Sequence, residues 1–390
     1  MTQSPTLVEA LALASTAVDD LVVTTARDTH AAIARRAHDV VRRGVGPAGA
    51  PAEALHRGIA AVVYGAVGLS LRGASAGLSR LGEAGVGPGL DDGPQGRFVR
   101  SAVNGLIGEE LRRDHPRLAI EMAVRDAGSD VPLTSAGVAA AFPAATPRLV
   151  VFLHGLCENE AYWHRHRDRV GSTYGESLAA RGWTPVYLRA NTGLGVRENG
   201  VALSALLQRL VELWPTDVAR IALVGHSMGG LVVRTATAVH AEPAAGHARW
   251  TDRVTDIVTL GTPHLGAPLA RTAHHGTALL NRMPESRGFG AILDRRSLGI
   301  RDLREGVAAE VPCLPHARYR LVSASLSASP RHPVAQVVGD LLVTPRSAVG
   351  RDRRGTELFP GAETLHVGRT GHFGLLNHPE VHAALSRWLG

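Results

Sequence analysis

Residues 221–233 read IALVGHSMGGLVV, and this stretch limits the possible fold more than any other part of the chain. Its first apolar run is typical of a strand buried on both faces, and its second has the spacing of a buried helix. Only a sharp turn can join the two, and Gly225 and Gly229 allow the close backbone approach that such a turn requires. Ser227 stands at the apex, where its hydroxyl would lie beside helix amides that favour negative charge.

The chain after Pro116 alternates short apolar runs with longer helical patterns. This rhythm predicts an α/β fold in which helices cover both faces of a mostly parallel sheet. The expected strands begin at Leu118, Arg148, Trp183, Ala219, Val254, Tyr319 and Glu363. Before Pro116 the segments are rich in alanine and place apolar residues at helical spacing, which predicts an all-helical region. We therefore expect a helical N-terminal region at 1–117 and an α/β domain at 118–390.

Residues 265–316 form a long insertion between two of the expected strands. Its apolar residues recur at helical spacings, as in TALLNRM and GFGAILDRRSLGIRDL. The insertion could be a cap whose apolar inner face binds an acyl chain. It could equally be a packed structural insertion, and the sequence alone favours neither.

The chain contains no lysine, so all 42 of its basic residues are arginines. Chemistry that needs a primary amine, such as a Schiff base, a pyridoxal-phosphate anchor or a P-loop, is therefore excluded. The formal net charge is +7, but the arginines are scattered and only 4% of the residues are aromatic. Binding of bases by stacking needs aromatic side chains among the basic ones, so nucleic acid is not an expected partner.

The N-terminus and the cysteines bear on the location of the protein. Glu9, Asp19 and Asp20 stand where a signal peptide would stay uncharged. Two cysteines in 390 residues cannot form a disulfide framework, and they fit a reducing compartment. The 14 uncharged residues between Arg57 and Arg72 are too few to cross a bilayer as a helix, which leaves a packed helix or a membrane-surface helix. We expect a cytoplasmic protein and leave peripheral membrane contact open.

Three motifs decide between a catalytic serine and a serine that only caps a helix. They are VGHSMGG from Val224, FLHGLCEN from Phe152 and LGTPHLGAP from Leu260. Together they resemble the lipase and esterase branch of the α/β-hydrolase superfamily, in particular bacterial lipases and the GPI inositol-deacylase-like hydrolases. The resemblance runs from about Leu118 to the C-terminus, and it implies an α/β-hydrolase fold with Ser227 as the nucleophile.

A serine hydroxyl needs a base to take its proton, and in this fold the acid and the histidine follow the serine along the chain. The C-terminal region offers four histidines, which are His366, His372, His378 and His382. His366 lies within an expected strand, and His378 and His382 belong to an expected terminal helix. His372 lies in a glycine-flanked loop after the last strand, where α/β-hydrolases resemble one another in holding the base. We predict His372 as the base.

The acid must orient the imidazole from a loop near the top of the sheet. The loop after the strand at Val254 reads GTPHLGAPLARTAHHG and contains no carboxylate. Asp340, within VVGDLLVTPRSAVG, resembles the lipase pattern of an aspartate followed by small and apolar residues and a serine. We predict Asp340 as the acid and keep Asp352 as the alternative, although the arginines around Asp352 favour a solvated ion pair.

The oxyanion of the transition state needs two preorganised donors. One should be the backbone N–H of Met228, the residue after the nucleophile. The second, by resemblance to the HGL type of lipase, should be the N–H of Leu156. Gly155 is followed by Leu156 and not by further glycines, so the chain departs from the HGGG type of esterase and from its preference for bulky tertiary-alcohol esters. Cys157 beside this loop is expected to be a small buried apolar residue and not a nucleophile.

Histidines also occur in pairs, at His164 and His166 and at His274 and His275. No HExxH, CxxC or facing carboxylate set accompanies them, so we predict surface histidines and no metal site. The expected partner is a small-molecule or lipid ester, with no cofactor. Neither the substrate-binding residues nor the oligomeric state can be predicted from the sequence.

The sequence therefore predicts a serine hydrolase that cleaves carboxylic esters, either an esterase or a lipase, through a Ser-His-Asp triad and an acyl-enzyme. The alternative is a thioesterase, amidase or acyltransferase that uses the same triad. A non-catalytic binding protein on a hydrolase fold is a further alternative. A binding protein has no need of nucleophile, acid, base and oxyanion loop together, and this argues against it.

Overall fold

The structure, a computed structural model, covers most of the chain after residue 87 and short parts before it. The described residues are 5–18, 75–78, 80–81, 87–239, 244, 246, 248–267, 297–306, 311–352 and 354–390. The apolar segment between Arg57 and Arg72 and most of the insertion 265–316 lie outside these residues. Among the described helices, none combines the length and the apolar character that a membrane span requires.

The chain divides into two compact units, Met1–Val103 and Asn104–Gly390. The described part of the first unit is helical, with α1 at Leu7–Val18 and a single antiparallel bridge between Thr6 and Gly89. Helix α4, Pro94–Asp114, begins in this unit and ends in the second. The domain boundary expected at 117/118 stays a prediction, and the structure groups residues 104–117 with the second unit.

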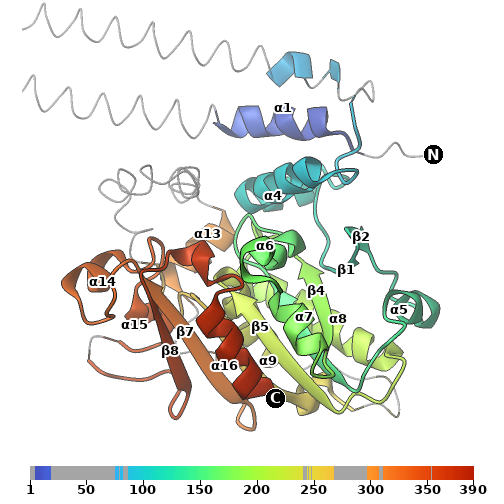
Figure 1. Ribbon diagram of the computed structural model, residues 1–390. Coiled ribbons are helices and arrows are strands. Elements are labelled where there is room, and N and C mark those ends of the chain that lie inside the picture. The colour runs from blue at the N-terminus through green and yellow to red at the C-terminus, as the bar shows by residue number, and fades with distance from the viewer. Residues whose placement is uncertain are drawn as a thin grey trace, which may run out of the picture. The chain divides into compact units, whose positions relative to one another are not determined.

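The described part of the second unit contains one sheet of eight strands in the order β2-β1-β4-β3-β5-β6-β7-β8 (Figure 1). The strands from β3 to β8 pair in parallel, and β1 pairs antiparallel with both β2 and β4. Their bounds are β1 Ala123–Asp126, β2 Ser129–Asp130, β3 Arg148–Leu153, β4 Thr184–Arg189, β5 Arg220–His226, β6 Val254–Leu260, β7 Arg318–Ser325 and β8 Glu363–Gly368. The expected mostly parallel sheet is confirmed.

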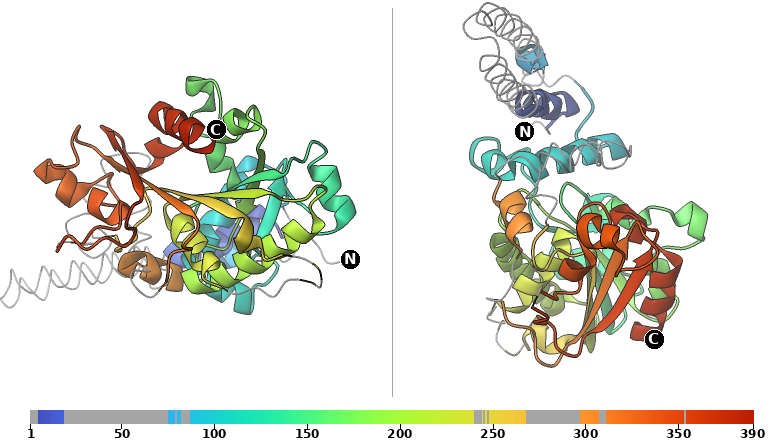
Figure 2. Two further views of the ribbon diagram at one scale, coloured as in Figure 1. Left: turned by 90° about the horizontal axis from the view of Figure 1, so that it is seen from below. Right: turned by 90° about the vertical axis from the view of Figure 1, so that its left-hand side faces the viewer.

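Helices cover both faces of this sheet, as the two views of Figure 2 show. Helices α8, Val196–Leu213, and α9, Met228–Thr237, pack on one face, while α7, Tyr174–Ala179, and α16, Pro379–Leu389, pack on the other. The remaining described helices of this unit are α5 Ser135–Ala141, α6 Arg167–Val170, α13 Leu298–Glu305, α14 Pro333–Val338 and α15 Pro345–Ala348, with 3-10 turns at Glu160–His164, Trp250–Arg253 and His372–Leu375.

The strands are buried on both sides, which explains why they read as continuous apolar runs. In β3 the side chains of Leu149, Val151 and Leu153 join the core under α8 and α9. Val150 and Phe152 point to the opposite face and join the core under α7 and α16. Because all strands from β3 to β8 run in one direction, the loops that follow them meet along one edge of the sheet.

Candidate active site

Ser227 lies between β5 and α9 in a strained turn, with φ 52° and ψ −124°. A non-glycine residue adopts such a backbone only when the surroundings enforce it. Here α9 approaches the sheet so closely that a methyl group on Gly225 would lie 2.5 Å from the Gly230 Cα, and one on Gly229 would lie 2.3 Å from the Leu153 carbonyl oxygen. The predicted strand, turn and helix are therefore present, and Ser227 is only 3% exposed.

Asp340 and His372 lie in contact with each other. Asp340 follows β7 along the chain, and His372 follows the neighbouring strand β8. His372 Nδ1–H donates to Asp340 Oδ2 at 2.8 Å, and both side chains are buried. The other oxygen of Asp340 accepts the N–H groups of Leu342 and Val343, at 3.0 and 2.8 Å. The carboxylate is thus held on both oxygens, and the imidazole is fixed in the tautomer that leaves Nε2 free to accept a proton. His372 Nε2 is buried and has no hydrogen-bond partner among the described residues.

The charge of Asp340 sets the basicity of His372. Burial alone lowers the pKa of an imidazole, but the Asp340 charge, its hydrogen bond and the more distant Glu158 charge outweigh the burial. The pKa of His372 therefore lies above its ordinary value. The ring packs against the end of β6, because a methyl group on Gly261 would lie 3.1 Å from its Cε1 atom.

The loop after β3 places Leu156 beside the serine. A methyl group on Gly155 would lie only 2.9 Å from Ser227 Cβ, so the two backbones are in contact. The loop turns back at Cys157, which has φ 61°, and Glu158 N–H donates to Gly155 O at 3.2 Å. In the part of the chain that the structure describes, neither Leu156 N–H nor Met228 N–H donates a recorded hydrogen bond. Two backbone donors with no recorded partner thus belong to segments that meet at Ser227.

Sequence reasoning missed two further charged or titratable groups at this place, Glu158 and His226. His226 Nδ1 lies 3.0 Å from Glu158 Oε2, and both side chains are buried. His226 also lies against His372, with 4.8 Å between the centroids of the two rings. His226 occupies the first unspecified position of G-x-S-x-G, and Glu158 follows HGLC in the loop after β3. No sequence signal connects them across 68 residues.

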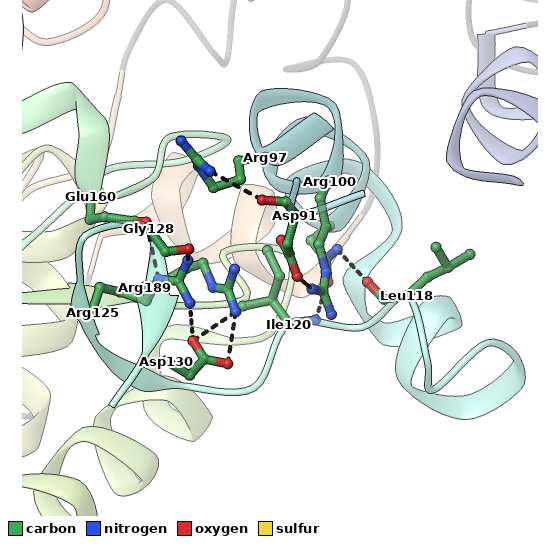
Figure 3. A network of polar contacts seen from close by, with 11 residues as sticks. Asp91, Arg97, Arg100, Leu118, Ile120, Arg125, Gly128, Asp130, Glu160 and Arg189 are labelled. Carbon is green, nitrogen blue, oxygen red and sulfur yellow. Dashed lines mark hydrogen bonds and ion pairs between the residues drawn. The ribbon is translucent and has the colours of Figure 1, made fainter. Parts of the chain in front are cut away.

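The same loop is anchored further on by Glu160, which belongs to the polar network of Figure 3. Arg125 Nε donates to Glu160 Oε1 at 3.0 Å, and the other end of this guanidinium binds Asp130. Arg189 NH2 also donates to Asp130, at 2.9 Å. This network ties the loop after β3 to the β1–β2 hairpin and to β4.

The alternative residues of the sequence analysis have other partners. Among the described residues, Asp352 makes no hydrogen bond or ion pair with a histidine, and its Oδ1 accepts the N–H groups of Arg354 and Thr356 in its own turn. His366 lies between the hydroxyls of Ser323 and Ser325 on β7. The other two histidines belong to α16, where His378 caps the first turn and His382 packs on α7.

No group of three potential metal ligands occurs among the described residues. His164 and His166 belong to the described part, where His164 packs on Tyr187 and His166 precedes α6. His274 and His275 lie outside it. Of the insertion, helix α13 is described, and a methyl group on its Gly299 would lie 3.2 Å from Met228 Cε. One end of the insertion therefore packs beside the candidate site.

Residues 144–314 match the family described as "Putative serine esterase (DUF676)". These residues include β3 with the loop after it and the β5–Ser227–α9 turn, and they end before Asp340 and His372. None of the curated proteins matches the chain.

Several solved structures are similar to the chain. The lipase BlEst2 of Bacillus licheniformis in its mature form is 20% identical, with a TM-score of 0.45, and the match covers 63% of this chain and 93% of that one. The Pyrococcus furiosus esterase Pf2001 is 17% identical, with a TM-score of 0.41, over 63% and 82% of the two chains. The carboxylesterase CesB of Bacillus subtilis is 13% identical, with a TM-score of 0.37, over 63% and 84%.

The fold is the α/β-hydrolase fold, with the mostly parallel sheet, the strand order and the strained serine turn described above. The family match over residues 144–314 makes the chain an enzyme of the ester hydrolase class. The expected resemblance to serine esterases on this fold is thus confirmed.

Proposed function

Starting from an ester hydrolase with an α/β-hydrolase fold, we propose that the chain cleaves carboxylic esters through a triad of Ser227, His372 and Asp340. Ser227 is the nucleophile, His372 the base and Asp340 the residue that orients the base. The backbone N–H groups of Leu156 and Met228 bind the oxyanion. The substrate is a small-molecule or lipid ester.

In the first half of the reaction, Ser227 Oγ attacks the acyl carbonyl carbon while its proton passes to His372 Nε2. The negative charge that develops on the carbonyl oxygen is stabilised by the two N–H groups, each worth about 3 kcal/mol in the transition state. When the tetrahedral intermediate collapses, His372 returns the proton to the leaving alcohol and the acyl group stays on Ser227.

In the second half, water attacks the acyl-enzyme and His372 Nε2 takes its proton. The new tetrahedral intermediate uses the same two donors, and its collapse releases the carboxylic acid and returns the proton to Ser227. Asp340 stays ionised throughout, because its task is to stabilise the imidazolium that forms in both halves.

One observation carries the proposal. His372 Nδ1–H donates to Asp340 at 2.8 Å while Nε2 stays buried without a recorded partner, at the same sheet edge as the strained serine. The Asp340 bond fixes the orientation of the ring and leaves its second nitrogen available to take a proton.

The test is the hydrolysis rate of p-nitrophenyl esters from acetyl to palmitoyl, measured with the wild type and with Ser227→Ala. We expect hydrolysis by the wild type and none above the uncatalysed rate with Ser227→Ala, at unchanged folding. Ser204→Ala is the matched control, since Ser204 is equally buried and its hydroxyl accepts from Trp250 at 3.1 Å away from the site. The chain length of fastest hydrolysis separates an esterase from a lipase.

Labelling with a fluorophosphonate addresses the other outcomes. If the wild type is labelled at Ser227 but hydrolyses none of the oxygen esters, the proposed substrate changes to a thioester or an amide, or the reaction changes to transfer of the acyl group to an acceptor. A wild type that is neither labelled nor active contradicts the triad and supports the non-catalytic alternative. Activity of Ser227→Ala at the wild-type rate would show that the nucleophile is another residue.

A further inference from the structure

Glu158 is a carboxylate that the proposed mechanism does not use, although it lies at the centre of the site. It is 2% exposed, and a carboxylate is almost never fully buried unless it is paired. A methyl group on Gly155 would lie 2.8 Å from Glu158 Oε1 and 2.9 Å from Ser227 Cβ. A side chain at position 155 would therefore meet both the carboxylate of Glu158 and the side chain of Ser227.

The carboxylate of Glu158 binds two different parts of the chain. Oε2 accepts Gly155 N–H at 3.0 Å, and His226 Nδ1 lies 3.0 Å from both Oε1 and Oε2. Gly155 precedes Leu156, and His226 precedes Ser227 and Met228. The carboxylate thus joins the two backbone segments that carry the proposed oxyanion donors.

The direction of the Leu156 N–H is fixed from the opposite end of its peptide group. His154 Nε2 accepts Ala190 N–H at 3.1 Å, so the proton of this ring is on Nδ1, which donates to Gly155 O at 2.9 Å. Glu158 N–H donates to the same oxygen at 3.2 Å. Gly155 C=O and Leu156 N–H belong to one planar trans peptide and point in opposite directions. The two donors that fix the direction of the Gly155 C=O therefore also fix the opposite direction of the Leu156 N–H.

The same pair reaches the base. His226 Nε2 lies 3.4 Å from the backbone carbonyl oxygen of His372. Burial by itself raises the pKa of Glu158, but the charge and the hydrogen bond of His226 and the Gly155 N–H outweigh it, so the pKa lies below its ordinary value. Glu158 is thus charged while it holds these contacts.

We propose that Glu158 is a positioning residue, which holds the turn of residues 155–158, called the oxyanion turn, against Ser227 by pairing its carboxylate with both Gly155 N–H and His226. The inference rests on the proposed function, because it concerns the donors of that mechanism. Glu158 touches neither the substrate nor the reacting atoms. Its effect reaches the reaction only through the direction and position of the Leu156 N–H.

The test compares Glu158→Gln with the wild type in kcat and KM on a p-nitrophenyl ester. The amide has the shape of the carboxylate but no charge, and its oxygen accepts more weakly. Loss of alignment of one oxyanion donor weakens only transition-state binding, so we expect kcat to fall about 100-fold while KM changes by less than about threefold.

Glu160→Gln is the matched control. Glu160 lies in the same loop, is 8% exposed and is paired with Arg125 at 3.0 Å, but it has no recorded contact with Gly155. We expect Glu160→Gln to lower the melting temperature at least as much as Glu158→Gln, with kcat within about threefold of the wild type. A purely structural role of Glu158 would make the two variants alike in kcat.

A phenylboronic acid supplies the readout that a structural role would not move. It forms a tetrahedral anion on an active serine, so its inhibition constant follows oxyanion binding in the way that kcat/KM does. In Glu158→Gln the inhibition constant should rise by about the same factor as kcat/KM falls. Unchanged boronate binding, or kcat within about twofold of the wild type, would overturn the proposal.

A second pair of variants keeps the proposal testable if Glu158→Gln does not fold. In His226→Asn the side-chain amide can still donate to Glu158, whereas in His226→Leu the new side chain has no donor and only Gly155 N–H is left. We expect Asn to retain at least tenfold more kcat than Leu, and equal rates would count against the proposal. The two inferences can fail separately. A wild type with no activity above that of Ser227→Ala overturns the proposed function, while an active wild type whose kcat is unchanged in Glu158→Gln overturns only the role of Glu158.

Discussion

At the residue scale, the bond between Asp340 and His372 links the proposed activity to pH. Burial lowers the pKa of the His372 imidazole, but the charge and hydrogen bond of Asp340 raise it to a net value above the ordinary one. Only the neutral ring can accept the serine proton, so kcat/KM should rise with pH through a midpoint above about 6.5. The measurement is a pH-stat titration of ester hydrolysis over a range of pH values.

Asp340→Asn is the variant that completes this prediction. Without the charge, burial dominates, so the midpoint should move to lower pH while the rate at the plateau falls by about 10⁴-fold. KM should change little, because Asp340 does not contact the substrate. A midpoint at the wild-type position would mean that another group controls the profile. Asp352→Asn, at a half-buried aspartate whose recorded bonds lie in its own turn, serves as the control.

Single residues also show what the sequence can and cannot predict. Ser227 can be placed because the turn that carries it is local, so its glycines and apolar flanks are visible in consecutive letters. His372 and Asp340 follow from chain order and from resemblance, and the structure brings these two into contact. The pairing of Glu158 with His226 could not be predicted, because it depends on a tertiary contact between two loops.

At the element scale, the contact of α9 with the sheet limits what the serine turn can contain. Gly229→Ala would place a methyl group 2.3 Å from the Leu153 carbonyl oxygen and 2.5 Å from that of His154. Backbone atoms cannot rotate away, so α9 must shift, and we expect a loss of about 2 kcal/mol or more in the free energy of unfolding. The loop before Leu156 would move with it, so kcat should fall as well.

The measurement is urea unfolding followed by tryptophan fluorescence, with the ester assay on the folded protein. Gly371→Ala is the control for stability, since φ is −84° there and the nearest atom to the added methyl group lies at 3.8 Å. Equal stability of Gly229→Ala and the wild type would contradict the close approach of α9.

Most elements of the second unit could be predicted because buried parallel strands are long apolar runs with turn residues around them. Each of the seven expected strands overlaps an observed strand. The first was expected from Leu118, but pairing with β4 begins only at Ala123. Strand β2 was missed, since its two polar residues, Ser129 and Asp130, pair only because the hairpin returns there. A tertiary contact made this strand, and no periodicity could reveal it.

At the scale of the whole molecule, a buried ion-pair cluster and the proposed triad lie at opposite ends of the parallel strands. Asp256, near the amino end of β6, is fully buried and forms ion pairs with Arg220 at 3.2 Å and Arg318 at 3.1 Å, and with Arg320. Burial raises the pKa of this carboxyl, but the Thr255 hydroxyl and the arginines outweigh the burial, so it lies below the ordinary value.

Asp256→Asn should therefore reduce the free energy of unfolding by about 3 kcal/mol, because it leaves the buried Arg320 guanidinium without its carboxylate. A lowered pKa in the folded state stabilises the protein above the unfolded-state value, near 3.8, and this contribution disappears as the pH falls through the folded-state value. The variant should thus lose less stability than the wild type in this acid range.

The measurement is urea unfolding at several pH values, with kcat expected to stay unchanged because the proposed triad lies at the other end of the strands. Asp217→Asn is the control, since Asp217 is exposed and its loss should cost less than about 0.5 kcal/mol. A kcat that falls together with stability would show that the two ends are coupled.

Cys157, whose backbone is in the left-handed region, is a natural chemical probe for opening of the oxyanion turn. Burial raises the pKa of its thiol to about 12, and a methyl group on Gly105 of α4 would lie 2.3 Å from its sulfur. Alkylating reagents attack thiolates that they can reach, so Cys157 is protected until the turn separates from α4. The half-buried Cys313 serves as an internal reference. The rate at which iodoacetamide modifies Cys157 therefore measures how often this turn opens in the native protein, without a substrate and without any engineered label.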